Sequence, residues 1–207
     1  MNKIVIGYGT GRCGTKSLAT FLTKQGYNVT HEGVALGWYQ VLTDTEATIR
    51  DFVSQKGVIG DVGFYWINYL DLILRKYPAK AINILRDDDE VIESFWSYKK
   101  PELQNLCNNT WKGYPFDSDV QTKEAIAFTI KRYRFLEASV VKMYPASIYR
   151  LKTDDLNNKA KLDSLLEWLD YDGFRILKPV HTNKREQILS KNANRRLDFP
   201  KRSRREN

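Results

Sequence analysis

The pattern of the first 26 residues predicts a strand, a glycine-rich loop and a helix, an order that occurs in few folds. Residues 3–7 (KIVIG) form a short apolar run with β-branched side chains, which favours a strand. A glycine-rich stretch (YGTGRCG) follows directly. Residues 15–26 then place Leu18, Phe21 and Leu22 at helical spacing and close on Gly26, a typical glycine at a helix end. The order strand, glycine loop, helix indicates an α/β fold.

The glycine loop, GTGRCGTKS at residues 9–17, has the composition of a phosphate-binding loop. Glycines let the backbone wrap around a phosphate, and the amides at a helix N-terminus point at the anion. Thr15 and Ser17 add hydroxyl donors, and Arg12 and Lys16 add positive charge. Lys16 stands one residue later than in the NTPase loop G-x-x-x-x-G-K-[ST], because Thr15 precedes it. A tight turn without a ligand is the alternative interpretation.

A second motif follows the apolar run at residues 80–85 and reads RDDDEVIES, from Arg86 to Ser94. An arginine at the carboxyl end of a strand lies where open parallel sheets bind their ligands. A guanidinium with a nearby hydroxyl suits a phosphate dianion. Two alternatives stay open: Arg86 is a surface ion-pair partner, or Asp87 is a magnesium ligand of an NTPase.

The remaining pattern predicts strands that alternate with helices. Further strands are expected at residues 27–31, 80–85 and 146–152, with a brief strand or a buried turn at 57–63. Helices are expected at 43–55, 65–77, 86–100, 122–144 and 159–169, and a loop or lid at 101–120. This alternation predicts a three-layer α/β fold, with a central parallel sheet of about four to five strands and helices on both faces. We expect one domain at residues 1–183 and a basic tail at 184–207.

Together the two motifs resemble those of the PAPS-dependent sulfotransferases, whose fold is of the P-loop nucleotide-kinase type. Residues 12–17 are similar to the 5′-phosphosulfate loop in its version with arginine first. The family's 3′-phosphate site reads strand, Arg-Asp-Pro, five residues and Ser, which Arg86 and Ser94 match. Asp88 stands where proline is usual. The resemblance extends from the first strand to about Ser94.

The resemblance implies a role for each residue of the two motifs. Arg12 would hold the bridging oxygen and stabilise the leaving phosphate, and Arg86 with Ser94 would hold the 3′-phosphate. Residues 178–185 look similar to the late loop that closes over the nucleotide, so Lys184 or Arg185 would reach a phosphate. The 5′-phosphate would be bound by Cys13, Gly14, Thr15, Lys16 and Ser17.

The family reaction is an in-line displacement that moves the sulfuryl group of PAPS to an acceptor hydroxyl or amine and releases 3′,5′-ADP. Protein cations stabilise the charge, so no metal is expected. Glu32, just past the second strand, resembles the glutamate base of some branches, and His31 is the second choice or a substrate contact. An ordinary loop acid at Glu32 is the alternative. A P-loop nucleotide or small-molecule kinase using ATP and magnesium is the alternative function.

The formal net charge is +8, and residues 184–207 hold nine basic and three acidic residues, so this tail alone carries +6. Such a tail suits an anionic ligand, nucleic acid or an anionic surface, and a solvated terminus is the alternative. Cys13 and Cys107 are too few for a disulfide framework, and Cys13 reads as a spacer in the loop.

We expect a cytoplasmic enzyme with no membrane span and no specific nucleic-acid partner. Carbohydrate, lipid, peptide and other small-molecule acceptors all stay open. The acceptor pocket would be lined by Trp38, Tyr39, Tyr65, Trp66 and Tyr69, or these residues pack in the core.

Overall fold

The computed structural model describes residues 4–34, 42–55, 59–99, 123–173 and 175–178. Its centre is a parallel sheet with the strand order β2-β3-β1-β4-β5. The strands are β1 (Ile4–Tyr8), β2 (Asn28–His31), β3 (Ile59–Val62), β4 (Ala79–Leu85) and β5 (Ile148–Lys152). All the predicted strands are confirmed, including the one at residues 57–63 that the sequence left between a strand and a turn. Because the strands are parallel, their carboxyl ends meet at one edge of the sheet.

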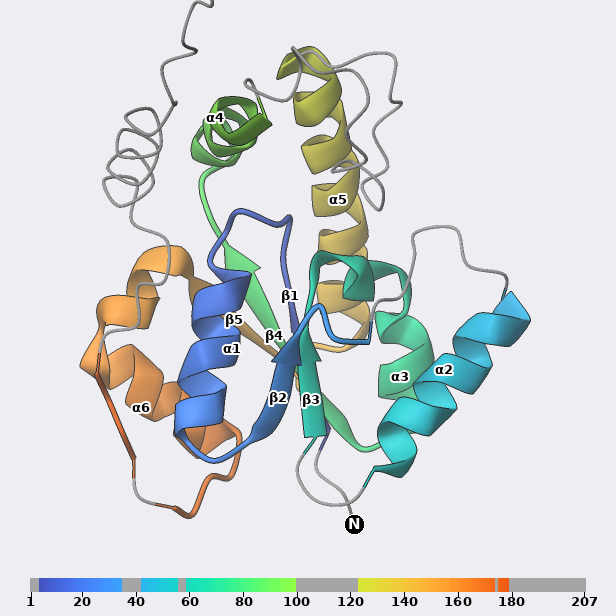
Figure 1. Cartoon of the computed structure of the whole chain (residues 1–207), viewed down its shortest axis with the longest axis vertical. Helices are drawn as coiled ribbons and strands as arrows, with labels where there is room; N and C mark the ends of the chain where they lie inside the picture. The colour runs from blue at the N-terminus through green and yellow to red at the C-terminus, as the bar shows by residue number, and fades with distance from the viewer. Residues whose placement is uncertain (1–3, 35–41, 56–58, 100–122, 174, 179–207) are drawn as a thin grey trace, which may run out of the picture.

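Helices cover both faces of this sheet (Figure 1), as predicted. Helices α1 and α6 lie on one face, and α2 and α3 lie on the other. The helices are α1 (Thr15–Lys24), α2 (Leu42–Ser54), α3 (Leu70–Lys76), α4 (Asp88–Lys99), α5 (Lys123–Met143) and α6 (Lys159–Trp168), with 3-10 helices η1 (Phe64–Asn68) and η3 (Thr153–Asn157). Within the described residues, no helix combines the length and the apolar character that crossing a membrane requires.

Side chains that alternate along β1 divide the core into two layers. Ile6 packs with residues of η1, α3 and α5 on one face, whereas Val5 packs with α1 and α6 on the other. Both side chains are buried, as expected for a strand inside a sheet that is covered on both sides. The two layers therefore cover the sheet on both faces.

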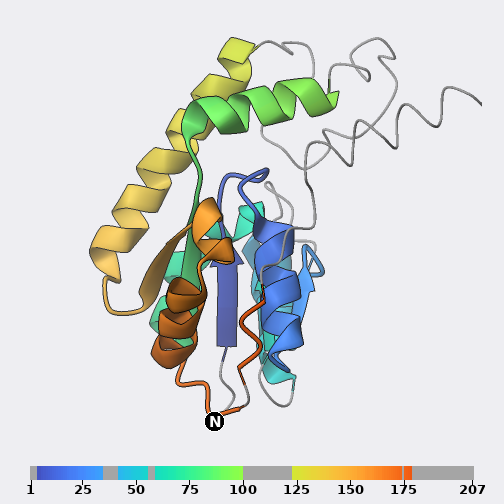
Figure 2. The same ribbon diagram turned by 90° about the vertical axis from the view of Figure 1, so that its left-hand side faces the viewer.

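Helix α4 lies across the carboxyl edge of the sheet, with α5 running down beside it (Figure 2). A separate apolar cluster joins the two helices through Val91 and Phe95 of α4 and Ile126 and Ile130 of α5. All four side chains are buried. Because α5 also packs on the sheet through Tyr133, this cluster holds α4 over the strand ends.

The prediction of one helix at residues 65–77 was wrong, because the segment divides into η1 and α3. Asp61 explains the division: Tyr65 Oη and Trp66 Nε1 donate to its Oδ2 at 2.5 and 2.8 Å. Both side chains must turn back toward the preceding strand, which a tight 3-10 turn allows. The alternative that Tyr65, Trp66 and Tyr69 pack in the core is confirmed, since none is more than 8% exposed.

The end of α1 confirms the role predicted for Gly26. Its φ is 87°, and its amide donates to the Thr23 carbonyl at 3.0 Å. The Tyr27 amide donates to the Leu22 carbonyl at 3.2 Å. These two bonds form a Schellman motif, which ends the helix and leads the chain into β2.

Candidate functional site

The glycine loop joins β1 to α1 at the carboxyl edge of the sheet. Its backbone passes through the left-handed region at Gly11 (φ 75°), Arg12 (φ 54°) and Gly14 (φ 99°). An arginine in this region is uncommon and marks a backbone that its surroundings hold in place. Gly14 is the N-cap of α1, and no side chain of the described residues caps this helix. The first-turn amides of α1 therefore offer the polarity that attracts an anion.

Cys13 fills the space beneath the loop, against Gly9. A Cβ atom at Gly9 would lie 2.5 Å from the Cys13 Sγ and 2.6 Å from the Ile84 carbonyl oxygen, so the position requires glycine. Burial raises the pKa of the Cys13 thiol to about 11, which keeps the thiol protonated at neutral pH. A buried, protonated thiol packs as a small apolar group, in keeping with the predicted spacer.

The two predicted motifs meet at the mouth of the glycine loop. Arg12 Nε donates to Ser94 Oγ at 3.2 Å, across 82 residues of sequence. Arg86 Nη1 donates to the Arg12 carbonyl oxygen at 2.9 Å. The guanidinium of Arg86 therefore faces the loop. The structure thus brings one cation of the first motif together with the arginine and the hydroxyl of the second.

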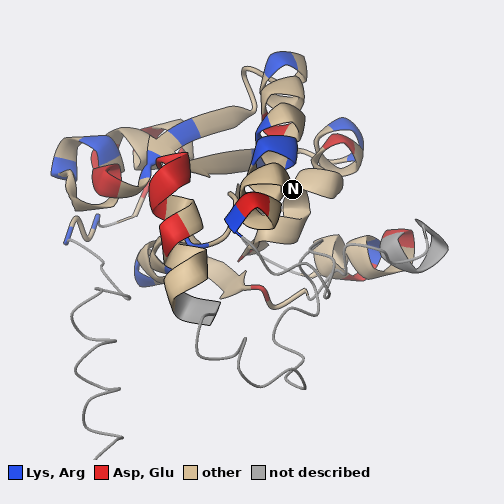
Figure 3. Ribbon diagram, turned by 90° about the horizontal axis from the view of Figure 1, so that it is seen from above, with Lys and Arg blue, Asp and Glu red and all other residues tan. Residues whose placement is uncertain are grey.

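The turn from β4 into α4 is capped by Asp87. Its Oδ1 accepts the amides of Asp89 and Glu90 at 3.0 and 3.1 Å, which is the usual N-cap arrangement. Asp88 is then the first helical residue, a position that favours proline and that the helix dipole also makes favourable for an acid. Arg86 Nε donates to Glu90 Oε2 at 2.8 Å. Figure 3 shows the acidic start of α4 in red.

The two candidate bases follow one another at the end of β2. His31 Nε2 lies 3.1 Å from Thr15 Oγ1, so the imidazole faces the first turn of α1. Glu32 has a φ of 56°, in the left-handed region, and its amide donates to the Val62 carbonyl at 3.0 Å. Both residues lie at the same edge of the sheet as the glycine loop.

Desolvation by the surrounding protein is the main cause of the pKa shifts of both residues. It raises the pKa of Glu32, and the charge of Asp61 raises this pKa further. It lowers the pKa of His31, an effect that Lys16 adds to and Asp61 opposes. Glu32 nevertheless keeps an exposed side chain and can exchange protons with water. A raised pKa on an accessible carboxylate suits a general base.

Asp61, fully buried at the end of β3, is a site residue that sequence reasoning missed. Besides Tyr65 and Trp66, it accepts bonds at Oδ1 from the Thr30 hydroxyl at 2.5 Å and from the Gly33 amide at 2.9 Å. Asp61 therefore fixes the turn that carries Glu32. A charge inside the apolar run at residues 57–63 was an available signal, because a buried carboxylate requires several donors.

Two further side chains hold this edge of the sheet together, and no pattern in the sequence marked them. Thr153, from η3, donates its hydroxyl to the carbonyl oxygens of Cys13 and Leu85 at 2.5 and 3.1 Å. Arg134, from α5, donates Nη2 to the Arg86 carbonyl oxygen at 2.7 Å. Each joins segments that are distant in sequence, so only the folded chain shows the contact.

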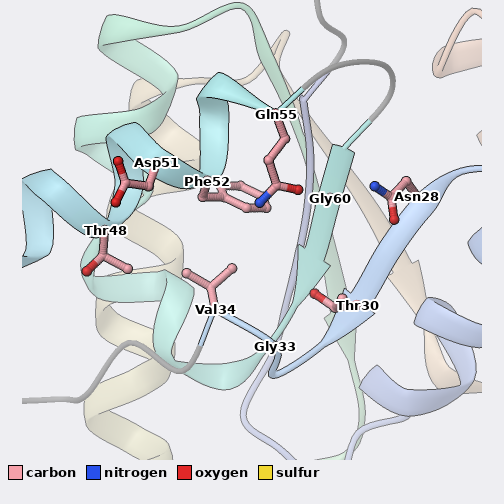
Figure 4. A pocket seen from close by; sticks show the side chains of 9 residues that line it. All are labelled: Asn28, Thr30, Gly33, Val34, Thr48, Asp51, Phe52, Gln55 and Gly60. Carbon is pink, nitrogen blue, oxygen red and sulfur yellow. The ribbon is translucent and has the colours of Figure 1, made fainter.

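A cavity of about 260 Å³ lies between α2 and the neighbouring strands β2 and β3 (Figure 4). Thr30 of β2 and Phe52 and Gln55 of α2 contribute to its lining. Since side chains alternate along a strand, Thr30 points to this cavity while His31 points to the opposite face. Glu32 follows β2 directly, and the next residues, Gly33 and Val34, line the cavity.

The described residues contain no group of three His, Cys, Asp or Glu side chains that could hold a metal ion. Asp87, the alternative magnesium ligand, uses one carboxylate oxygen to cap α4. The magnesium hypothesis for Asp87 therefore rests on its place after β4 alone.

Other predicted features lie outside the described residues. They include the loop or lid at residues 101–120, the boundary at residue 183 and the basic tail at 184–207. Their roles stay predictions. The individual residues concerned are Trp38, Tyr39, Cys107, Lys184 and Arg185.

The chain resembles known proteins in structure rather than in sequence. No family model matches it. No curated protein matches it either. Among solved structures, a sulfotransferase from Alicyclobacillus acidocaldarius matches with a TM-score of 0.56 at 11% sequence identity, and the match covers 95% of this chain and 92% of that protein. The chain has the P-loop sulfotransferase fold.

Two other solved structures are similar to this sulfotransferase-fold chain. The YorR protein of Bacillus subtilis, in complex with phosphorylated GDP, matches 79% of this chain and 96% of its own, with a TM-score of 0.43 and 15% identity. A de novo designed protein with a P-loop NTPase fold matches 70% of this chain and 96% of its own, with a TM-score of 0.30 and 14% identity. At such low identities the likeness concerns the fold, and the activity has to come from the site.

Proposed function

We propose that this protein is a sulfotransferase that moves the sulfuryl group of PAPS to an acceptor hydroxyl or amine and releases 3′,5′-ADP. The hydrogen bond between Arg12 and Ser94 carries this proposal. It joins the loop expected to hold the 5′-phosphosulfate to the helix expected to hold the 3′-phosphate. A ligand with one anionic group at each end would engage both motifs.

The expected 5′ end of the ligand lies over the glycine loop. The amides from Cys13 to Ser17 would surround the 5′-phosphate, and the hydroxyls of Thr15 and Ser17 would add donors. Lys16 contributes positive charge from an exposed position. These groups are supplied by the backbone and by short side chains, so the loop has little conformational entropy to lose on binding.

The 3′ end would lie against Arg86 and Ser94. In the free protein Arg86 divides its donors between the Arg12 carbonyl and Glu90. A phosphate dianion would replace the exposed Glu90 carboxylate as the stronger partner. This exchange gives specificity for a nucleotide with a 3′-phosphate, because a ligand without that group leaves the existing ion pair in place.

The reaction forms one bond and breaks one bond at sulfur. The acceptor oxygen or nitrogen attacks, the bond from sulfur to the 5′-phosphate oxygen breaks, and its electrons remain on the departing 3′,5′-ADP. Arg12 would stabilise the charge that grows on this leaving oxygen. The proton of the acceptor would go to a base at the end of β2.

Glu32 is the base that the observations favour. Its pKa is raised, and its side chain remains accessible. Gly33 and Val34, which follow Glu32 in the chain, line the cavity beside α2, so an acceptor bound there would lie close to Glu32. His31 instead points to the face of α1 and interacts with the Thr15 hydroxyl. A neutral carbohydrate or another small polar molecule would suit the mixed lining of the cavity.

The test compares nucleotides by thermal shift and then measures transfer. We expect 3′,5′-ADP to raise the melting temperature without any metal, and radiolabelled PAPS to label at least one member of an acceptor panel. Stabilisation by ATP with Mg²⁺ but not by 3′,5′-ADP would overturn the proposal in favour of a P-loop kinase. In that case phosphate transfer from ATP to nucleotides and small molecules should be measured next.

A further inference from the structure

Arg134 of α5 makes three hydrogen bonds, two of them to the turn from β4 into α4 and one within its own helix. Its Nη2 donates to the Arg86 carbonyl oxygen at 2.7 Å, and its Nε donates to Asp88 Oδ1 at 2.8 Å. Its Nη1 donates to Glu137 Oε2 at 2.8 Å. The three bonds use three different nitrogens of one planar group, whose side chain is only 20% exposed. The guanidinium therefore has one orientation relative to the turn.

The buried carboxylate of Glu137 also fixes the orientation of the Arg134 guanidinium. The side chain of Glu137 is 6% exposed, and its Oε1 accepts a hydrogen bond from Asn83 Nδ2. Asn83 is fully buried in β4, three residues before Arg86. Arg134 is thus connected to the same strand at two points, through its direct bond to the Arg86 carbonyl and through Glu137 and Asn83.

The turn that Arg134 contacts carries an unusual concentration of negative charge for a phosphate site. Four acidic residues, at positions 87–90, follow Arg86 directly. Carboxylates repel a phosphate dianion, and the first helical position holds Asp88 rather than a proline that would fix φ. Arg134 counters both effects, because it neutralises Asp88 and holds the carbonyl group of Arg86. Two of the other acids have separate partners: Asp87 caps α4, and Glu90 pairs with Arg86.

We propose that Arg134 is a positioning residue for recognition of the 3′-phosphate. It holds the β4–α4 turn in the conformation that presents Arg86 to the ligand, and it reduces the negative charge beside the bound dianion. The proposal rests on the proposed function, because it assumes that Arg86 binds a 3′-phosphate. Its consequence is selective: Arg134 affects ligands that carry this phosphate and leaves the others unaffected.

The experiment uses Arg134→Lys and isothermal titration with two ligands, 3′,5′-ADP and 5′-AMP. Lysine keeps a positive charge beside the buried Glu137, but its single ammonium group cannot reproduce the three hydrogen bonds that the planar guanidinium donates. We expect the Kd for 3′,5′-ADP to rise about tenfold, the equivalent of one charge-assisted hydrogen bond. The Kd for 5′-AMP should stay within about twofold. Each ratio is measured on one preparation, so a reduced fraction of folded protein does not affect it.

A second variant tests whether the turn itself is responsible. Asp88→Pro in the Arg134→Lys background supplies a fixed φ and removes one carboxylate, so it should restore part of the lost affinity for 3′,5′-ADP. Arg132→Lys is the matched control, because Arg132 is exposed on the same helix. It should change neither Kd.

The outcomes separate this role from the function on which it rests. If the wild-type protein binds both ligands equally, the proposed function and the role of Arg134 are both overturned. If the wild type prefers 3′,5′-ADP and Arg134→Lys keeps the full preference, or weakens both ligands equally, the role of Arg134 alone is overturned. Absence of any recovery with Asp88→Pro would contradict the role of the turn.

Discussion

The carboxyl edge of the sheet has two halves that are built differently. At the ends of β1 and β2, the proposed catalytic residues Arg12 and Glu32 both have a left-handed backbone, with φ values of 54° and 56°. At the end of β4, the residues around Arg86 and Asp88 are in ordinary conformations, and ion pairs with Glu90 and Arg134 surround them. The first half is shaped by the backbone, and the second is shaped by charged side chains.

This difference has a physical meaning. A left-handed conformation at a residue other than glycine costs free energy, so it persists only where neighbouring contacts enforce it. It fixes the direction of a side chain that must act on a reacting atom. Ion pairs at the surface contribute little stability and can exchange partners when an anion arrives. We therefore expect substitutions in the first half to change turnover and those in the second half to change affinity.

The largest expected effect is that of Arg12→Ala. The loss of the cation that stabilises the leaving oxygen should lower kcat by about 100- to 1000-fold, as for other preorganised donors. Transfer from radiolabelled PAPS measures this, with Lys24→Ala at the exposed end of α1 as the control. A kcat within tenfold of the wild type would contradict the proposed catalytic role of Arg12.

Asp61→Asn should have the next largest effect, on stability. Asp61 accepts four hydrogen bonds while fully buried, and an amide group would face some of these donors with its own NH₂. We expect a loss of about 3 kcal/mol in the free energy of unfolding, measured by urea denaturation. Asp163→Asn on α6 is the control, since it removes only a half-exposed partner of Arg175. An equally small effect of both changes would show that Asp61 does not stabilise the first half of the carboxyl edge.

Glu32→Gln should lower kcat by about 100-fold while the affinity for 3′,5′-ADP is unchanged, because only proton transfer is lost. The pH profile sharpens this test. The wild-type rate should fall as the pH drops through the raised pKa of Glu32, above the ordinary value of 4.5. The lowered pKa of His31 lies below 6.5, so either base would give a limb in this region.

Variants distinguish the two candidate bases. If Glu32 is the base, His31→Gln keeps the acidic limb of the profile and Glu32→Gln abolishes it. Stability should move the opposite way: because folding raises the pKa of Glu32, its ionised form disfavours the folded state as the pH rises. Glu32→Gln should therefore melt higher than the wild type at neutral pH, with no gain below pH 4.5. Glu167→Gln on α6 serves as the control for both measurements.

The smallest expected effect concerns the second half of the edge, at the end of β4. Glu90→Gln removes the carboxylate that pairs with Arg86, so 3′,5′-ADP should bind about threefold more tightly, as expected for a weak surface pair. Affinity for 5′-AMP and the melting temperature should stay constant. Glu93→Gln, one turn further along α4, is the matched control. Weaker binding by Glu90→Gln would mean that Glu90 supports Arg86 instead of competing for it.

The sequence predicts those parts of the molecule that depend on neighbouring residues. The strand, glycine loop and helix at the N-terminus follow from local periodicity and from Gly26. The strands β1 and β4 were found because each is a short apolar run between turn residues. The pairing of the two motifs could be expected only through the family resemblance.

The remainder depends on contacts between distant segments. Arg134 and Glu137 look like ordinary helix residues until α5 packs beside β4, and Thr153 looks like an ordinary residue after a strand. The helix expected at residues 65–77 was broken by hydrogen bonds to Asp61, which local propensity does not register. Long-range polar contacts of this kind thus determine the geometry at the end of β4.

The hydroxyl of Thr153 bonds to the carbonyl groups at the ends of both halves, at Cys13 and at Leu85. The separation between the two motifs proposed to bind anions is therefore set by the protein before any ligand arrives. Such a site would select ligands by the distance between their two phosphate groups as well as by their charge. An isomer such as 2′,5′-ADP, equal in charge but different in span, should be rejected for its geometry alone.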